Sequence, residues 1–539
     1  MHLKLLFSIS FLLIFIFNTL LAQTGHKEQM NTIAYQNPVI PGFHPDPSVC
    51  RVGNDYYLVT SSFEFFPGIP VFHSKDLVHW KQIGRVLTRK SQVNLEGLGK
   101  WSGIYAPSIR YHEGVFYVAS TNVNGGGNFY VTATNPAGPW SDPVWVDQHW
   151  FDPSLFFDDD GKTYYLRRGN EGAVMAEINL ETGQLLAEPK TISSGFVSTD
   201  MEGPHLYKIN GFYYLMAAEG GTRATHMETI GRSKNIWGPY EPNPANPILS
   251  QHKGWTYIRA TGHGDLIQAH DGSWWMTFLA TRHHSYDAMS HLGRETFLAK
   301  VKWVDGWPVV KENVVTSLVQ NLSGLQPHPW PEDPVRDDFA QDKLKPMWNF
   351  LRNPSKGSWS LTARQGYLQL TGNKSNLSDI DAPAFVGRRQ QHFNCTVRTK
   401  MAFDPKNPNE EAGLTTFLNY EHHYDMFVGT IDGKKHLIMR KTIGDLSCKT
   451  KSVPISGQSV ILEIVAERDT YQFRYSEDGE LFKLLDTAKT QYLGTELASV
   501  FTGTFFAMYA TGNGQPSQAP ADFDWFDYEE GAPVLEIRY

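Results

Sequence analysis

Five stretches of the sequence share one pattern, and this repetition restricts the fold more than any other feature. Each begins with a small or acidic residue, continues as a short apolar run, turns at Gly, Asn or Asp, and ends in an aromatic-rich run. This pattern predicts a β-hairpin. The stretches are DPSVCRVGNDYYLVTSS (from Asp46), APSIRYHEGVFYVASTN (from Ala106), DPSLFFDDDGKTYYLRRG (from Asp152), EGPHLYKINGFYYLMAAEG (from Glu202) and HGDLIQAHDGSWWMTFLA (from His263).

The repeats predict a five-bladed β-propeller over residues 33–323, with a β-sandwich of similar hairpins as the alternative. Their starts are 60, 46, 50 and 61 residues apart, which suits one four-stranded blade plus loops. The first strand of each blade lines the central channel, so the leading residues of the repeats gather at one mouth. Three of these leading residues are the acids Asp46, Asp152 and Glu202, and the fifth repeat places a His263-Gly264-Asp265 turn there. Gathered carboxylates raise one another's pKa, so stability alone does not favour them.

Clustered carboxylates serve two chemistries that need neither cysteine nor a nucleotide-binding loop: binding of a hard metal such as calcium, and acid–base cleavage of a glycosidic bond. The second needs an ionised and a protonated carboxyl group, roughly 6.5 to 9.5 Å apart in inverting enzymes. Pro45 and Pro47 restrict the backbone on both sides of Asp46, which suits a base that must aim a water molecule. A turn-forming role is an equal alternative for Asp46 or Asp152 taken singly, but Glu202 has no local capping role.

Ordered motifs over most of the chain resemble glycoside hydrolase family 43, in particular its β-xylosidase and α-L-arabinofuranosidase members. They are NPVIPGFHPDPSVCRVGNDYYLVTSSFEFFPG, WFDPSLFFDDDGKTYYL, TDMEGPHLYKINGFYYL, RATGHGDL and GRETFLAKV. The resemblance implies that Asp46 is the general base and Glu202 the general acid. It also implies that Asp152 raises the pKa of Glu202 and orients it, in a reaction that inverts the anomeric centre.

The same resemblance implies substrate-binding roles for four other residues. Arg294, in GRETF, contacts the bound sugar, and His263, in TGHGD, lies near the channel centre, where it binds a water or an ion or only fills the channel. Phe63, in SSFEFFPG, lies beside the leaving group, with core packing as the alternative. Tyr105, in WSGIYAPSIR, stands where the xylosidases commonly have Trp, which argues against a strict xylose preference.

We therefore expect an inverting, exo-acting glycoside hydrolase that releases xylose, with arabinofuranose as a second product, from oligosaccharides of plant cell-wall xylan or arabinoxylan. An α-L-arabinofuranosidase without xylosidase activity and a non-catalytic carbohydrate-binding propeller are the alternatives. A retaining fructosidase would be expected to start with a motif such as N-D-P-N, and a sialidase would show S-x-D-x-G-x-T-W repeats; neither motif appears. The net charge of −8 argues against a nucleic-acid partner.

The N-terminal segment MHLKLLFSISFLLIFIFNTLLAQTG predicts a signal peptide over residues 1–22 and export to the periplasm or the medium, with no membrane attachment of the mature form. An uncleaved membrane anchor is the alternative. The three cysteines are too few for a disulfide framework, and pairing of Cys395 with Cys448 stays open.

A proline-rich linker over residues 324–336 separates the propeller from a second domain over residues 337–539, whose short alternating segments predict a β-sandwich. The sandwich either binds polysaccharide as a separate module or closes one side of the active site, with Phe505 and Phe506 as candidates to reach it. No organic cofactor is expected, a structural calcium stays open in either domain, and the oligomeric state is undetermined.

Overall fold

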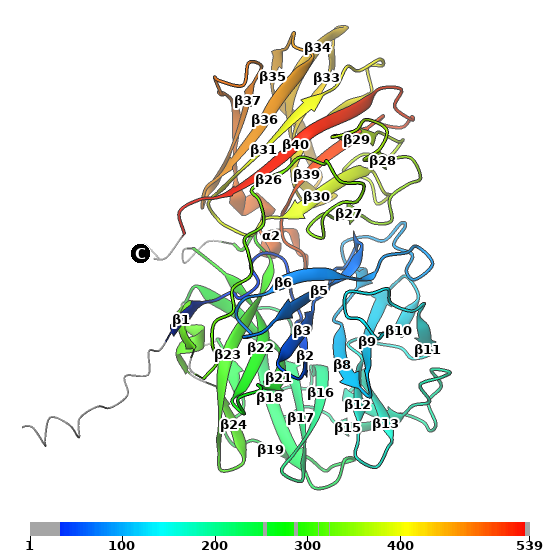
Figure 1. The fold of residues 1–539 in the computed structure, drawn as a ribbon, viewed down its shortest axis with the longest axis vertical. Helices are drawn as coiled ribbons and strands as arrows, with labels where there is room; N and C mark the ends of the chain where they lie inside the picture. Colours follow the sequence, from blue (N-terminus) through cyan, green and yellow to red (C-terminus); the bar gives the residue numbers. More distant parts are fainter. Residues whose placement is uncertain (1–32, 252–255, 285–288, 311, 323, 534–539) are drawn as a thin grey trace, which may run out of the picture.

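The computed structural model describes residues 33–251, 256–284, 289–310, 312–322 and 324–533 (Figure 1), and the predicted signal peptide lies outside this range. Strands make up nearly all of the regular structure. The helical elements in the described part are η1 (Glu312–Val315), η2 (Thr490–Leu493) and α2 (Thr495–Ala498). The predicted all-β class is therefore confirmed. In the same part of the chain, no helix is long and apolar enough to cross a membrane.

The N-terminal half folds into antiparallel sheets that follow one another along the chain, five within the described residues. Their strands, sheet by sheet, are β2 (Ser48–Val52), β3 (Asp55–Val59), β5 (Gly68–Ser74) and β6 (Lys81–Leu87); β7 (Gly103–Ile104), β8 (Ser108–His112), β9 (Val115–Val123), β10 (Gly127–Ala133) and β11 (Val144–Val146); β12 (Ser154–Phe157), β13 (Thr163–Gly169), β14 (Gly172–Glu177) and β15 (Lys190–Ser193); β16 (Glu202–Ile209), β17 (Phe212–Glu219), β18 (Met227–Ser233), β19 (Glu241–Pro242) and β20 (Leu249–Ser250); β21 (Ile258–Gln268), β22 (Trp274–Arg282), β23 (Arg294–Val304) and β24 (Trp307–Val310).

These sheets are arranged around a common centre. The strands β2, β8, β12, β16 and β21 each contact the next one in this order, and β21 contacts β2 again. Outside the ring, β1 (Ile33–Gln36) pairs with β25 (Val319–Leu322), so the two ends of this half lie together. The half is a β-propeller, as the repeats predict. Asp46, Ala106, Asp152 and Glu202 lie at or near the starts of their inner strands, whereas His263 lies inside β21.

The C-terminal half is a sandwich of two antiparallel sheets. One contains β26 (Arg336–Asp337), β28 (Trp359–Ser360), β29 (Leu368–Thr371), β31 (Cys395–Ala402), β36 (Ser459–Ala466), β37 (Thr470–Ser476), β38 (Lys483–Lys489) and β40 (Pro520–Glu530); the other contains β30 (Ala384–Arg389), β32 (Glu411–Asn419), β33 (His422–Ile431), β34 (Lys434–Ile443), β35 (Leu446–Pro454) and β39 (Phe505–Thr511). The predicted β-sandwich is confirmed. Cys395 is buried, Cys448 is exposed, and the two are not bonded.

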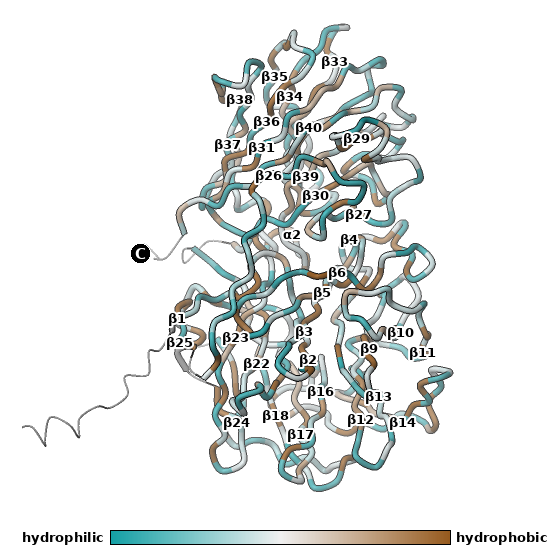
Figure 2. Tube along the Cα trace, viewed as in Figure 1, coloured by the Kyte–Doolittle hydropathy of each residue, from teal (hydrophilic) through white to brown (hydrophobic). Residues whose placement is uncertain are grey.

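Burial follows the strand period. Residues of β31 alternate between buried and half-buried, because one face of this strand packs into the sandwich core. Nine successive residues of β32 are buried, since this strand is covered on both faces. Figure 2 shows hydrophobic residues recurring along the strands of both halves, with hydrophilic residues between them.

The two halves are joined by backbone pairing as well as by side chains. In the loop after β3, β4 (Phe65–Phe66) pairs with β27 (Phe350–Leu351) of the sandwich. The ring of Phe65 stacks on Phe505 at 4.0 Å between centroids, inside a buried aromatic cluster that both halves supply. The linker is also anchored, because the backbone N–H of His328 donates to Asp76 and the indole of Trp330 donates to the carbonyl of His79.

One carboxylate ties the inner strands together. Asp265 accepts hydrogen bonds from Ser48 Oγ at 2.7 Å, from the Val49 N–H at 3.0 Å and from Tyr207 Oη at 2.7 Å, and it pairs with Arg110 Nη1 at 2.9 Å. Burial by itself would raise the pKa of Asp265, but Arg110, His205 and these hydrogen bonds lower it to about 2.

The predicted turn at residues 263–265 is wrong: these residues lie inside β21, whose pairing with β22 shifts register at two irregularities there.

We expect Asp265→Asn to reduce the free energy of unfolding by about 3 kcal/mol at pH 7, because it leaves the buried Arg110 charge unpaired. The folded pKa lies below the ordinary value, so the wild-type advantage is full above about pH 4 and fades as the pH falls toward 2. Urea denaturation followed by tryptophan fluorescence measures both effects, with Asp305→Asn, at an exposed position, as the control. Equal stability of the two variants at pH 7 would contradict the role given to Asp265.

Candidate active site

A pocket of about 300 Å³ lies at the propeller mouth and is lined by all seven residues that the sequence singles out. The lining consists of Asp46, Phe63, Tyr105, Ala106, Phe151, Asp152, Arg168, Asp200, Glu202, Gly221, Thr222, His263, Arg294 and Phe501. The propeller thus brings together predicted residues that are up to 248 positions apart: Asp46 lies just before β2, and Arg294 begins β23, the third strand of the fifth sheet.

Asp46 is fixed by both its backbone and its side chain. Its φ is +55°, a left-handed conformation that is uncommon for a residue with a Cβ and unusual before proline. Its carboxylate pairs with Arg294, at 2.9 Å from Nη1 to Oδ1, and accepts a hydrogen bond from Ser61 Oγ at 2.5 Å. Asp46 is therefore a buried carboxylate with a single orientation, as the flanking prolines suggest.

Asp152 repeats this backbone geometry, with a φ of +58°, also directly before a proline. Its Oδ2 accepts a hydrogen bond from the Gly203 N–H at 3.1 Å, and so anchors the residue that follows Glu202. Burial raises the pKa of Asp152 well above its ordinary value, and the charges of Glu202 and Asp46 raise it further. This side chain therefore combines a structural contact to β16 with a carboxyl group that is harder to ionise than an exposed one.

Glu202 begins β16, and its carboxyl group is close to a second ion pair. Arg168 Nη1 lies 3.2 Å from Glu202 Oε2, while Arg168 Nη2 lies 2.7 Å from Asp200 Oδ1. Burial raises the pKa of Glu202 to about 7; Arg168 opposes this shift, and the negative charges of Asp200 and Asp46 add to it. A carboxyl group with this pKa is substantially protonated at neutral pH and able to donate its proton.

The four predicted substrate-binding residues line the pocket in different ways. Arg294 spans it, since its guanidinium pairs with Asp46 and also donates to Thr222 Oγ1 at 3.1 Å. Phe63 is almost wholly buried and packs against Tyr105 with 5.1 Å between ring centroids, so it is both core and pocket wall.

Tyr105 and His263 are likewise held by their neighbours. The hydroxyl of Tyr105 donates to the carbonyl of Trp101 at 2.9 Å, so this proton is not directed at a ligand. His263 is buried, its pKa is lowered by burial, and a Cβ at Gly203 would lie 2.8 Å from its ring. Glycine at position 203, which also has a φ of +58°, thus permits the close packing of β16 on β21.

Sequence reasoning missed several lining residues, above all Phe501. This residue belongs to the loop before β39 of the sandwich, and its ring lies 5.5 Å from that of Phe63 and 4.6 Å from that of Trp101. Phe505 and Phe506, the residues considered from sequence, do not line the pocket: both are fully buried, Phe505 in the cluster between the halves and Phe506 in the sandwich core. The sandwich therefore supplies one wall of the pocket through a residue that no motif marks.

Arg168, Asp200 and Phe151 were also missed, although Phe151 directly precedes the Asp152 motif. Arg168 lies 5.2 Å from the ring of Phe151, which helps to hold it beside Glu202. Within the described residues, no group of three or more His, Cys, Asp or Glu side chains is arranged to hold a metal ion. The site thus offers a fixed carboxylate beside an arginine, and a second, protonated carboxyl group, in one small pocket.

Two family models match the chain: Glycosyl hydrolases family 43 over residues 35–308, and the beta xylosidase C-terminal concanavalin A-like domain over residues 336–529. A non-reducing end alpha-L-arabinofuranosidase of Bacteroides ovatus is 48% identical over 503 residues, which cover 92% of this chain and 94% of that protein. A xylan 1,3-beta-xylosidase of a Vibrio species is 38% identical over 537 residues, covering 93% of this chain and 100% of that protein.

Solved structures agree with this result. A Bacteroides ovatus protein described as Xyloglucan PUL GH43B superposes with a TM-score of 0.89 at 47% identity, over 92% of this chain and 100% of that one. A xylan beta-1,4-xylosidase from Bacillus halodurans gives a TM-score of 0.87 at 36% identity, over 92% of this chain and 100% of that one. The protein therefore belongs to glycosyl hydrolase family 43 and is a glycoside hydrolase.

Proposed function

We propose that this enzyme is an exo-acting, inverting glycosidase that removes terminal α-L-arabinofuranosyl residues from plant cell-wall oligosaccharides. The observation that carries the proposal is the site itself: an oriented carboxylate on Asp46 and a carboxyl group with a pKa of about 7 on Glu202 share one small pocket. The choice of arabinofuranose is supported by the Bacteroides ovatus arabinofuranosidase, which is 48% identical over nearly the whole of both chains.

In this mechanism Asp46 is the general base. It accepts a proton from a water molecule as the water attacks the anomeric carbon, while Glu202 donates its proton to the departing glycosidic oxygen. The bond to the leaving sugar breaks as the bond to water forms, and no covalent sugar intermediate arises. Asp152 anchors Gly203 and so keeps Glu202 in place, whereas Arg294 orients Asp46 and faces the sugar.

The pKa of Glu202 is set by several groups. The sequence resemblance gives Asp152 this task, but the structure points first to burial and then, among the charges that raise it, to Asp200 and Asp46. Between these two acids the effect runs from Glu202 to Asp152, since the charge of Glu202 raises the pKa of Asp152. Asp200 therefore joins the proposed machinery as a residue that tunes the acid.

Exo action is supported by the shape of the site. The pocket volume of about 300 Å³ is at the small end of the range for ligand sites, and Phe501 of the sandwich closes one wall. A chain end fits such a pocket, whereas the middle of a polysaccharide needs an open cleft.

We also propose that the five sheets are the blades of a five-bladed propeller, that the domains extend over residues 33–323 and 337–539, and that residues 1–22 direct export.

Release of β-linked xylose is the second candidate, and the sequence analysis placed it first. It is supported by relatives named as xylosidases, among them the Vibrio protein at 38% identity and a Bacillus subtilis β-xylosidase at 35%. Tyr105 argues for a changed sugar platform, because its hydroxyl is engaged with Trp101 and the ring is smaller than an indole.

To test the proposal, the enzyme is incubated with an arabinose-decorated xylo-oligosaccharide and the released sugars are identified over time. We expect arabinose to appear first, and Asp46→Asn and Glu202→Gln to lower kcat about 10³-fold, because each removes a proton-transfer group. The exposed variant Asp305→Asn is the control. Xylose as the first product would favour the second candidate, and activity retained in both carboxyl variants would overturn the assigned roles.

Inversion is tested separately with proton NMR. Hydrolysis of an α-L-arabinofuranoside is expected to give the β anomer first, followed by mutarotation, because water attacks the face opposite the leaving group. An α anomer as the initial product would show retention, and would require a nucleophilic carboxylate in place of a base.

The pH dependence of kcat/KM tests the tuning of Glu202. The acid must be protonated, so we expect the rate to fall as the pH rises through about 7. Asp200→Asn removes a negative charge that raises this pKa, and it removes the ion pair between Asp200 and Arg168, whose charge lowers the pKa. The alkaline limb is therefore expected to move to lower pH by about half a unit or more, while an unchanged or higher limb would contradict this electrostatic role.

A further inference from the structure

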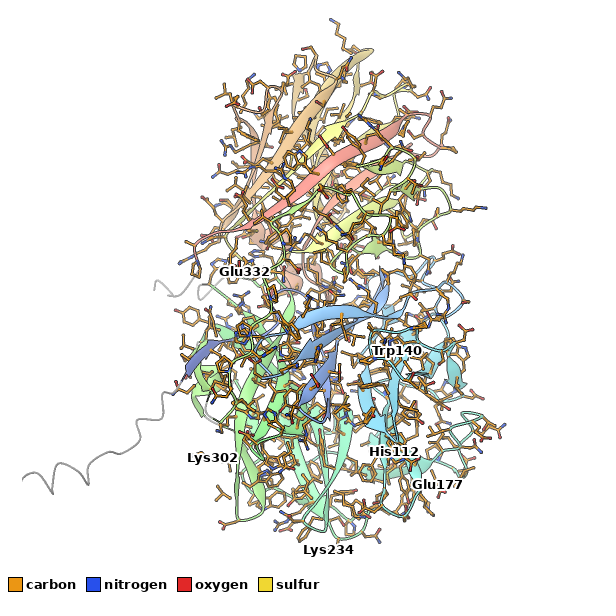
Figure 3. All side chains as sticks on the ribbon, viewed as in Figure 1. His112, Trp140, Glu177, Lys234, Lys302 and Glu332 are labelled. Atoms are coloured by element: carbon orange, nitrogen blue, oxygen red, sulfur yellow. The ribbon has the colours of Figure 1, made fainter. Side chains whose placement is uncertain are left out.

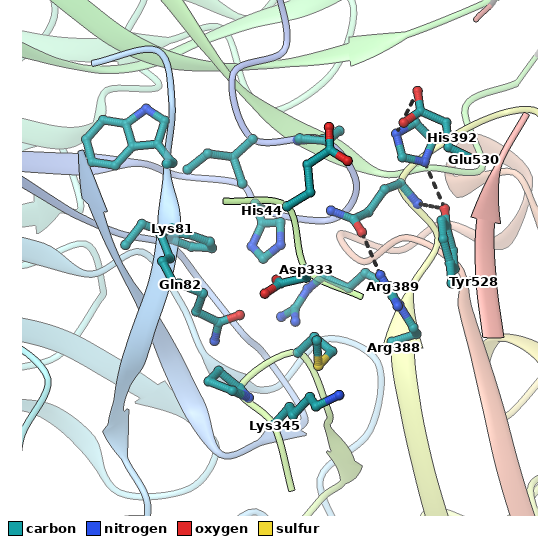
Figure 4. A pocket seen from close by; sticks show the side chains of 18 of the residues that line it. His44, Lys81, Gln82, Asp333, Lys345, Arg388, Arg389, His392, Tyr528 and Glu530 are labelled. Carbon is teal, nitrogen blue, oxygen red and sulfur yellow. Dashed lines mark hydrogen bonds and ion pairs between the residues drawn. The ribbon is translucent and has the colours of Figure 1, made fainter. Parts of the chain in front are cut away.

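A second pocket, of about 610 Å³, lies between the propeller, the linker and the sandwich (Figure 4). Its walls come from three parts of the chain: residues 39–41, 44, 72 and 80–82 of the propeller, residues 332–335 of the linker, and residues 345–347, 388, 389, 391, 392, 528 and 530 of the sandwich. Of the residues that line the catalytic pocket, none lines this one. Its volume lies in the range of sites for small ligands.

The buried end of this interdomain pocket carries a positive charge without a carboxylate partner. Arg389, on β30, is 4% exposed, and Figure 4 shows its side chain extending toward the middle of the pocket. Its Nε donates to the carbonyl of Phe43 at 2.6 Å and its Nη1 to Asn349 Oδ1 at 3.0 Å, but its Nη2 has no hydrogen-bond partner among the residues that the structure describes.

No acid in the described residues compensates this charge at close range. Arg389 makes no ion pair there, and neither does the neighbouring Arg85, whose guanidinium donates to the carbonyls of Pro67 and Pro346. Burial and Arg85 together lower the pKa of Arg389. A buried guanidinium with an open N–H is unfavourable unless an anion pairs with it, because burial removes the water that would otherwise solvate it.

The exposed end of the pocket has a different character. Glu332 and Asp333 of the linker are exposed, Gln82 and Lys81 lie on β6, and Trp80 adds an aromatic surface. Carboxylates at the rim repel a polyanion, but they can accept hydrogen bonds from the hydroxyl groups of a ligand. The side chains of Gln82 and Lys81 can donate hydrogen bonds to the oxygens of the same hydroxyl groups. The lining thus suits a ligand with one anionic end and a hydroxyl-rich body.

We infer that the interdomain pocket binds a sugar acid, a monosaccharide or short oligosaccharide whose carboxylate pairs with Arg389 and whose hydroxyl groups contact the rim. The bound carboxylate supplies the partner that Nη2 lacks, in a charge-assisted hydrogen bond. The ligand would contact all three walls and so favour the joined arrangement of propeller, linker and sandwich. The inference does not depend on which sugar the catalytic pocket cleaves.

Isothermal titration of the full chain with sodium D-glucuronate tests this site. Arg389 also holds Phe43 and Asn349, so its replacement risks the fold, and the rim offers safer variants. Lys81→Gln removes an exposed positive charge from the pocket, and Asp333→Asn removes a negative one. Lys302→Gln is the matched control, because Lys302 is exposed on β23 and Figure 3 shows it well apart from the labelled rim residue Glu332.

We expect saturable binding of one D-glucuronate, about threefold weaker in Lys81→Gln, tighter in Asp333→Asn and unchanged in Lys302→Gln. D-xylose, which has no carboxylate, and acetate and inorganic phosphate, which have no hydroxyl-bearing ring, are expected to bind much more weakly. The inference is overturned if D-glucuronate does not bind, or if Lys81→Gln and Asp333→Asn leave its affinity unchanged. If D-xylose bound equally well, the role of the ligand carboxylate would be refuted. If acetate or phosphate bound equally well, the role of the hydroxyl-bearing sugar ring would be refuted.

Discussion

The buried carboxylate of Asp265 is the interaction on which the geometry of the propeller mouth depends. It lies on β21 and holds β2 through Ser48 and the Val49 N–H, β8 through Arg110, and β16 through Tyr207. β12 is held in another way, since Ser154 donates to the carbonyl of Pro204. Because the proposed catalytic acids lie at the starts of these strands, a rigid centre fixes their separation. The hydrogen bonds between the inner strands thus hold the carboxyl groups in fixed positions relative to one another.

Local backbone and burial then give each acid a distinct character. Asp46 and Asp152 are both held in left-handed backbone conformations before proline, a strained geometry that the surrounding ring must impose. The two differ in their partners: Asp46 forms an ion pair with Arg294, whereas Asp152 accepts a hydrogen bond from the Gly203 N–H and lies near the Glu202 carboxyl group. Glu202 is half-buried beside Arg168, and its pKa of about 7 reflects the balance of its partial loss of solvent against that positive charge. Acids at one mouth are therefore made unequal by their surroundings.

The sandwich is part of the proposed active site and not an independent attachment. Its contact with the propeller combines a paired strand, β4 with β27, and a stacked aromatic cluster that includes Phe43, Phe65 and Phe505. This cluster lies directly behind Phe63 and Phe501, which form walls of the catalytic pocket. Phe43 is also the residue whose carbonyl receives Arg389 from the interdomain pocket. The segment around residues 43–46 thus separates the two pockets and contacts both.

The sequence by itself determined the all-β class, the repeated hairpins, the order of propeller and sandwich, and the seven candidate residues that the pocket gathers. Repeats in one register place Asp46, Asp152, Glu202 and His263 at equivalent points of the propeller, so these residues could be grouped without any knowledge of contacts. Arg294, Phe63 and Tyr105 followed from the resemblance to family 43. Only the tertiary structure decided the ion pair of Asp46 with Arg294, the effects of Arg168 and Asp200 on the pKa of Glu202, and the position of Phe501 in the wall of the catalytic pocket. These features depend on burial and on contacts between residues far apart in the chain, such as the 207 positions between Arg294 and Phe501. A local sequence pattern contains no information on burial or on long-range contacts. For the same reason residues 263–265 of β21, whose pairing with β22 is irregular at residues 259–265, resemble a turn in the sequence although they lie in a strand.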